Sequence, residues 1–127
     1  MTKFYFDFLS PYSYLASALI EQKYSHLDLD YQPVVLGSML SKLGATGPGE
    51  IASRRKIGLE DLLLLTQYFN IKLEGPPTHP FNSIYALRSV CAVNSPEKRR
   101  KLTHCYFHAA WAQGQNLEDL EVLRNCL

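Results

Sequence analysis

The sequence has no long apolar run and almost no net charge, and each absence excludes a class of protein. Its apolar runs reach only about one helical turn, as in Leu62–Leu65, far short of the roughly 18 residues that cross a bilayer. The formal net charge is +1, so the basic excess typical of nucleic-acid-binding proteins is missing. The N-terminus has no basic region followed by an apolar stretch, and no signal peptide is expected. The sequence therefore predicts neither a nucleic-acid partner nor a membrane partner.

Cysteine is also scarce, and no two cysteines are spaced Cys-x-x-Cys. The three are Cys91, Cys105 and Cys126, so dithiol redox chemistry is not expected. Each lies in a helical pattern among apolar neighbours, and free cysteine behaves as a small hydrophobic residue. We therefore expect three buried free thiols and a reducing, cytoplasmic location.

The start of the chain has the pattern of a strand, a helix and a second strand. With 127 residues, the chain is one domain at most by length. Aromatic and β-branched residues favour strands at Lys3–Phe8 and Leu29–Val35, and an apolar stripe favours a helix at Pro11–Tyr24. A βαβ unit of this kind has parallel strands. Its aromatic first strand would be exposed in a single copy, which predicts a symmetric homodimer formed by sheet extension or by burial of the aromatic strand face.

Only helices are expected after residue 36. They are predicted at Gly37–Leu43, Glu50–Tyr68, Asn82–Val93, Pro96–Gln113 and Leu117–Cys126. The segment Gly75–Pro80 contains three prolines and is excluded from helices and central strands, with Pro77 or Pro80 a candidate for a cis bond. The predicted division is a βαβ unit over residues 1–36 and a helical insertion over residues 37–127.

The segment Phe4–Leu15 carries the candidate chemistry. The strand leads directly to Ser10 at a helix N-cap position, with Pro11 at the first helical position. Unpaired N–H groups and a partial positive charge at this helix terminus would stabilise a thiolate or another anion. The alternative is a purely structural cap, since Ser95-Pro96 repeats the device without an attached site.

The string Asp-Phe-Leu-Ser-Pro-Tyr-Ser-Tyr-Leu at Asp7–Leu15 resembles the start of the 2-hydroxychromene-2-carboxylate isomerases and the kappa-class glutathione transferases, in the DsbA-like branch of the thioredoxin superfamily. There Ser-x-x-Ser or Ser-x-x-Ala replaces the redox Cys-x-x-Cys, at positions matching Ser10 and Ser13. The segments Pro33–Gly37, Pro77–Asn82 and Phe107–Leu117 also resemble these families. The implied fold class is α/β: a thioredoxin-like βαβ start, then an all-helical insertion domain, with the C-terminal thioredoxin strands missing.

The resemblance implies glutathione as cofactor and a small aromatic substrate. Ser10 would be the catalytic residue, donating a hydrogen bond to the glutathione sulfur and favouring the thiolate. The thiolate would add to a conjugated carbonyl compound and leave after rotation, giving cis–trans isomerisation; kappa-class relatives keep the adduct as transferases. The implied glutathione- or substrate-binding residues are Pro11, Tyr12, Ser13, Ala45 and Arg54.

Three residues depart from the family pattern and open a second hypothesis. The family usually has Asn at the position of Ala45, Lys at that of Arg54 and Tyr at that of Ile57. Arg is a planar fork whereas Lys is a point charge, so the exchange keeps charge and changes geometry. The family's cis-proline loop also belongs to the C-terminal part that this chain lacks. The alternative is therefore a catalytically inactive remnant or a helical interaction module.

Four further features have structural and functional interpretations. Asp7 is expected to be a buried charge that orients the helix. His104 and His108 have the spacing of a metal pair on one helical face, although two partly exposed histidines are the simpler interpretation. The basic run Lys98–Lys101 could bind phosphate, although a solvated helix face is the simpler interpretation. Trp111 with Phe107 is expected in the core, and the alternative is a place in the lining of a substrate pocket.

Overall fold

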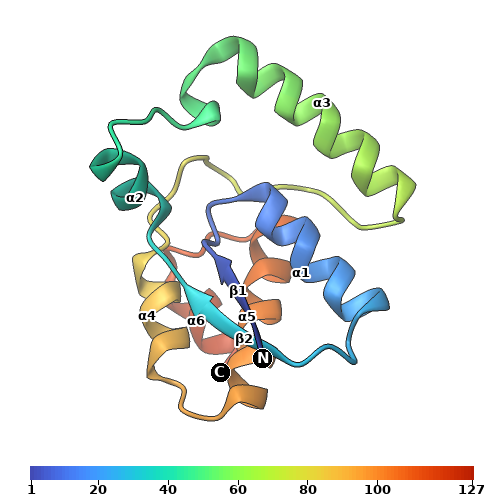
Figure 1. Ribbon diagram of the computed structural model, residues 1–127, viewed down its shortest axis with the longest axis vertical. Coiled ribbons are helices and arrows are strands. Elements are labelled where there is room, and N and C mark those ends of the chain that lie inside the picture. Colours follow the sequence, from blue (N-terminus) through green and yellow to red (C-terminus); the bar gives the residue numbers. More distant parts are fainter.

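The computed structural model describes all residues 1–127, and its two strands pair in the predicted parallel arrangement (Figure 1). Strand β1 (Thr2–Phe6) and strand β2 (Leu29–Pro33) are joined by helix α1 (Pro11–Lys23). The register places Phe4 opposite Tyr31. Both strands end two residues before the predicted limits. The Asp7 carboxylate starts a turn after β1, and the last bond between the two strands is that from the Val34 N–H to the Phe6 carbonyl over 2.9 Å.

The rest of the chain is helical, as predicted. The helices are α2 (Leu36–Lys42), a 3₁₀ turn (Pro48–Glu50), α3 (Ala52–Tyr68), α4 (Ile84–Ala92), α5 (Pro96–Phe107), a π-helical turn (His108–Ala112) and α6 (Leu120–Asn125). The predicted helix Pro96–Gln113 thus changes its winding at His108, which shifts the register of its last turn. No helix combines the length and apolar character that a bilayer-crossing segment needs.

The core lies between the strands and the long C-terminal helix. Ring centroids of Phe6 and Phe8 lie 5.7 Å and 4.7 Å from that of Phe107. Both phenylalanines are almost completely buried, so the expectation that this aromatic face is exposed in a single chain is wrong. One cluster of 17 buried residues combines side chains from both predicted parts of the chain. The boundary at residue 36 stays a prediction.

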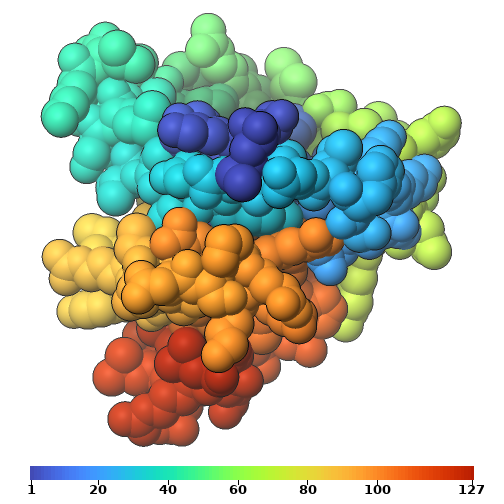
Figure 2. Space-filling view, turned by 60° about the horizontal axis from the view of Figure 1, so that its bottom comes forward, coloured from blue at the N-terminus to red at the C-terminus, as the bar shows by residue number.

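Helix α3 lies at the edge of the molecule. In Figure 1 it forms the upper rim, and Figure 2 shows the α2–α3 region (teal to green) and the C-terminal segment (red) at opposite ends. Only Leu62 and Thr66 of this helix are buried. The apolar Ile57 is 66% exposed, because the apolar residues of α3 lie on several sides and only one side faces the body.

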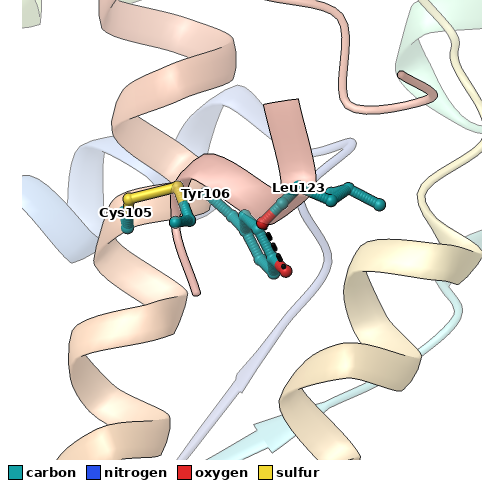
Figure 3. Close-up of a disulfide and its surroundings, with 4 residues drawn as sticks. Cys105, Tyr106 and Leu123 are labelled. Carbon is teal, nitrogen blue, oxygen red and sulfur yellow. Dashed lines mark hydrogen bonds between the residues drawn. A yellow bond between two sulfur atoms is a disulfide. The ribbon is translucent and has the colours of Figure 1, made fainter. Parts of the chain in front are cut away.

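The cysteines differ from prediction. Cys105 on α5 and Cys126 after α6 form a disulfide with a Cα–Cα distance of 5.8 Å (Figure 3). Cys91 is a free cysteine and is exposed. Beside the disulfide, the Tyr106 hydroxyl donates to the Leu123 carbonyl over 3.5 Å. The prediction of three buried free thiols is therefore wrong, because packing α6 against α5 places two cysteines 21 residues apart in contact.

Candidate functional site

The turn before helix α1 is held by a buried carboxylate. Asp7 is 3% exposed, as predicted. It accepts hydrogen bonds from the Leu9 N–H at 3.1 Å, the Leu36 N–H at 2.9 Å and the Ser83 hydroxyl at 2.6 Å. One carboxylate thus connects the end of β1 with the starts of α2 and α4, and this orients the residues that follow it.

Ser10 caps helix α1, as predicted. Its extended backbone (φ −89°, ψ 118°) directs Oγ to accept from the Ser13 N–H at 3.2 Å. The hydroxyl proton of Ser10 has no acceptor in the chain, so it is available to a ligand. Pro11 has no N–H, and the Tyr12 N–H has no acceptor. No acidic residue lies in the first turn of α1. The helix terminus therefore presents an O–H donor, an N–H donor and an uncompensated partial positive charge.

Trp111, from the π-helical turn, and Tyr14, from α1 itself, pack beside the turn. The Trp111 indole N–H donates to the Phe8 carbonyl over 2.8 Å, and its ring stacks on Tyr14 with centroids 6.3 Å apart. Trp111 is 5% exposed, which confirms its predicted core position. The Tyr14 hydroxyl donates to the Lys72 carbonyl. These contacts fix the first turn of α1 from the side opposite to solvent.

His79 is a candidate site residue that sequence reasoning missed. Its Nε2 donates to the carbonyl of Leu9 over 2.8 Å, next to Ser10. A carbonyl only accepts, so Nε2 is the donor in this bond. The His79–Pro80 peptide bond is cis. His79 lies in the proline-rich segment and in the family-like stretch Pro77–Asn82, but neither signal indicated contact with a residue 70 positions away.

Tyr12 connects the site to α3. Its hydroxyl donates to Asp61 Oδ2 over 2.7 Å. This hydrogen bond, with smaller contributions from burial and from the Asp61 charge, raises the pKa of Tyr12. Tyr12 is therefore a protonated donor whose ring is 45% exposed at the helix terminus. Ser13 contributes to the cap of α1 through its backbone N–H, which donates to Ser10 Oγ, and the Ser13 hydroxyl has no hydrogen-bond partner.

Ala45 and Arg54 are not brought into contact with Ser10. Ala45 is exposed, and its N–H donates to the Leu40 carbonyl over 2.9 Å, in the cap that ends α2 at Gly44. Its amide is therefore already paired. Arg54 is exposed and forms no hydrogen bond or ion pair; it lies about 10 Å along α3 from Asp61. The roles predicted for these two residues stay predictions.

The other predicted clusters have structural partners. His104 Nδ1 bonds Ser17 Oγ, and His104 Nε2 lies 3.0 Å from both the Tyr31 hydroxyl and Glu21 Oε1. His108 is exposed, and no group of three potential metal ligands exists in the chain. The prediction for the basic run is only half right. Lys98 and Lys101 are exposed, but Arg99 bonds the Val93 carbonyl and Arg100 bonds Glu21.

Comparison with known proteins places this arrangement in a family. The family model for the DsbA-like thioredoxin domain matches residues 1–127. A 2-hydroxychromene-2-carboxylate isomerase from Sphingobium xenophagum is 29% identical over 99% of this chain and 67% of its own length. A kappa 1 glutathione S-transferase from Caenorhabditis elegans is 31% identical over 58% of this chain and 34% of its own length.

A solved structure of a 2-hydroxychromene-2-carboxylate isomerase superposes with a TM-score of 0.83 at 23% identity, over 98% of this chain and 64% of that one. The chain thus spans about a third of the transferase and about two thirds of the isomerases. The βαβ start, the helical continuation and the serine at the N-terminus of α1 all agree with the fold expected from the sequence. The chain belongs to the DsbA-like thioredoxin domain family.

Proposed function

We propose that this chain carries the thiol-activating part of a glutathione-dependent isomerase of the 2-hydroxychromene-2-carboxylate type. One observation carries the proposal: Ser10 caps α1 with its hydroxyl proton unused. Membership of the DsbA-like family and similarity to proteins named isomerase and kappa transferase support it. Glutathione is the reduced thiol of the cytosol, so the proposal also implies a cytoplasmic location, where a disulfide such as Cys105–Cys126 is uncommon.

The residues at this helix terminus fit a thiol ligand. Ser10 donates its O–H to the sulfur, and Tyr12 offers the adjacent backbone N–H. Because no acidic side chain lies in the first turn, the helix terminus keeps its partial positive charge and favours the thiolate. Bound glutathione would supply a thiolate that adds reversibly to a conjugated carbonyl compound. Asp7 and His79 hold the turn, so both donors keep their direction during the reaction.

Titration calorimetry with glutathione tests the role of Ser10. The chain is compared with Ser10→Ala and with Ser95→Ala, a matched control that removes the same kind of cap from α5. We expect Ser10→Ala to weaken binding about tenfold, the worth of one hydrogen bond to a charged group. Ser95→Ala should bind like the parent. Equal affinities for the parent and Ser10→Ala would remove Ser10 from this role.

A turnover assay separates the isomerase from its alternatives. The full chain is incubated with glutathione and a conjugated aromatic pyruvate. Recovery of the trans isomer with glutathione unchanged supports the isomerase, and consumption of glutathione indicates a transferase of the kappa type. The paired amide of Ala45 and the distant Arg54 favour an inactive remnant or a helical interaction module as the alternative. Absence of turnover with intact glutathione binding would support that alternative.

We also propose that the active form is a homodimer. The sheet contains only β1 and β2, so each strand has an unpaired edge. Tyr5 on β1 is 59% exposed. Pairing two copies along these edges would satisfy the free backbone groups and cover this ring. Sedimentation at micromolar concentration should show a species of twice 14.5 kDa. A compact monomer as the only species would contradict the proposal.

A further inference from the structure

A groove between α1 and α5 lies outside the Ser10 site. It has a volume of about 630 Å³, within the range of small-molecule sites. On α1 it extends from Tyr14 to Gln22. Its centre at Ala18 is about 12 Å from Ser10 along the helix. The groove is therefore separate from the proposed thiol site, although one helix contributes to both.

The floor of the groove is apolar and fixed in place. Its apolar lining includes Tyr14, Ala18, Ile71, Phe107 and Ala112. Tyr14 is held by its stacking on Trp111 and by its hydrogen bond to the Lys72 carbonyl. Phe107 is 1% exposed and packs on the rings of β1. These two rings are buried and support the floor from below, so the apolar surface open to a ligand is that of the half-buried Ala18 and Ile71.

The rim of the groove carries unpaired positive charge. Lys72 lines the groove, is exposed, and forms no side-chain hydrogen bond or ion pair. Lys101 also lines it and pairs with Glu97 over 2.7 Å. Glu21, the only carboxylate in the lining, accepts two hydrogen bonds from Arg100 at 2.9 Å and 2.7 Å. The Lys72 ammonium is therefore the charge left for a ligand.

A cluster of three polar side chains in the groove wall resembles a catalytic triad but has a structural role. Ser17, His104 and Glu21 are bonded in sequence, as a nucleophile, base and acid would be. Ser17 is 1% exposed in the middle of α1, however, where backbone N–H groups are paired within the helix and form no oxyanion hole. The cluster thus fixes the wall that joins α1 to α5.

We propose that this groove binds an amphipathic organic anion, with its apolar body on Ala18 and Ile71 and its carboxylate at Lys72. The chemistry admits an aromatic or an aliphatic body. The unpaired Lys72 ammonium favours an anion over a neutral molecule, because the apolar floor alone would accept either equally well.

Titration calorimetry on the full chain tests the proposal with three probes: naphthoate, its uncharged analogue naphthalenemethanol, and octanoate. Naphthoate should bind more tightly than naphthalenemethanol by about fivefold, the upper value of an exposed ion pair. The ratio of naphthoate to octanoate affinity tells whether the occupant is aromatic or aliphatic. Failure of both acids to bind overturns the proposal.

Charge-reversal variants locate the binding. Lys72→Glu should weaken naphthoate binding about tenfold, because attraction is replaced by repulsion. Lys98→Glu makes the same charge change at an exposed position on α5 outside the lining, and it should bind naphthoate like the parent. Equal weakening in the two variants would mean a general charge effect and would overturn the site. These titrations contain no glutathione, so their outcome is independent of the glutathione experiments.

Discussion

Replacement of Asp7 by alanine should destabilise the fold through the turn that positions Ser10. The carboxylate accepts three hydrogen bonds and is 3% exposed. Each hydrogen bond to a charged group contributes about 1.5–3 kcal/mol, but such values are not additive. Removing the buried carboxylate recovers its desolvation penalty. Water can also reach the half-buried Leu9 and Leu36. We therefore expect Asp7→Ala to lower the free energy of unfolding by about 3–4 kcal/mol, or about 10–15 °C in Tm.

Two further variants define what the carboxylate does. Asp7→Asn keeps an acceptor for Leu9 and Ser83 but turns an NH₂ group towards the Leu36 N–H, so it should lose about 2 kcal/mol. Asp28→Ala removes an exposed carboxylate without a side-chain hydrogen bond, and it should change stability by less than about 0.5 kcal/mol. Urea unfolding followed by circular dichroism measures all three variants. If Asp7→Ala behaved like Asp28→Ala, the anchoring role of Asp7 would be refuted.

Three other perturbations follow from the contacts. Cys126→Ala opens a crosslink between cysteines 21 residues apart, and the free energy of unfolding measured in urea should fall by about 3 kcal/mol. Three titratable thiols in the parent chain would disprove the crosslink. Burial lowers the pKa of His104 from 6.5 to about 4 against the opposing effect of Glu21. As pH falls, His104 is therefore protonated in the unfolded chain before it is protonated in the folded chain. The free energy of unfolding should fall by roughly 3 kcal/mol as pH drops from 6.5 to 4. An equal loss in His104→Gln would show that this histidine is not the cause. Tyr12→Phe removes the exposed bond to Asp61 and should change Tm by less than about 4 °C, with a larger loss indicating a wider role.

Local signals in the sequence were sufficient to predict the βαβ unit and the cap of α1. Ser10 and Pro11 are adjacent in the chain, and their preferences depend on backbone conformation alone. The burial of Asp7 was also predictable, because a charge at the end of an aromatic strand needs partners close by. Its actual partners, Leu36 and Ser83, come from other parts of the fold.

Features that depend on distant packing were not predictable. His79 meets Leu9 across 70 residues, and Cys105 meets Cys126 only because α6 folds back onto α5. Ile57 is apolar but belongs to a helix with apolar residues on several sides, so its pattern does not indicate a single buried face. The family pattern named Arg54 as a ligand-binding position, but a local match does not fix where α3 lies relative to Ser10.

The pKa of the glutathione thiol bound to the chain tests the central claim most directly. It is measured from the ultraviolet absorbance of the thiolate as pH is raised, with the chain in excess over glutathione. We expect the pKa of the bound thiol to lie below the free thiol value of about 8.5, because the Ser10 O–H and the N-terminus of α1 favour the thiolate. Ser10→Ala should move the pKa back towards the free value. A bound thiol that titrates at or above the free value in the parent chain would contradict thiol activation by Ser10.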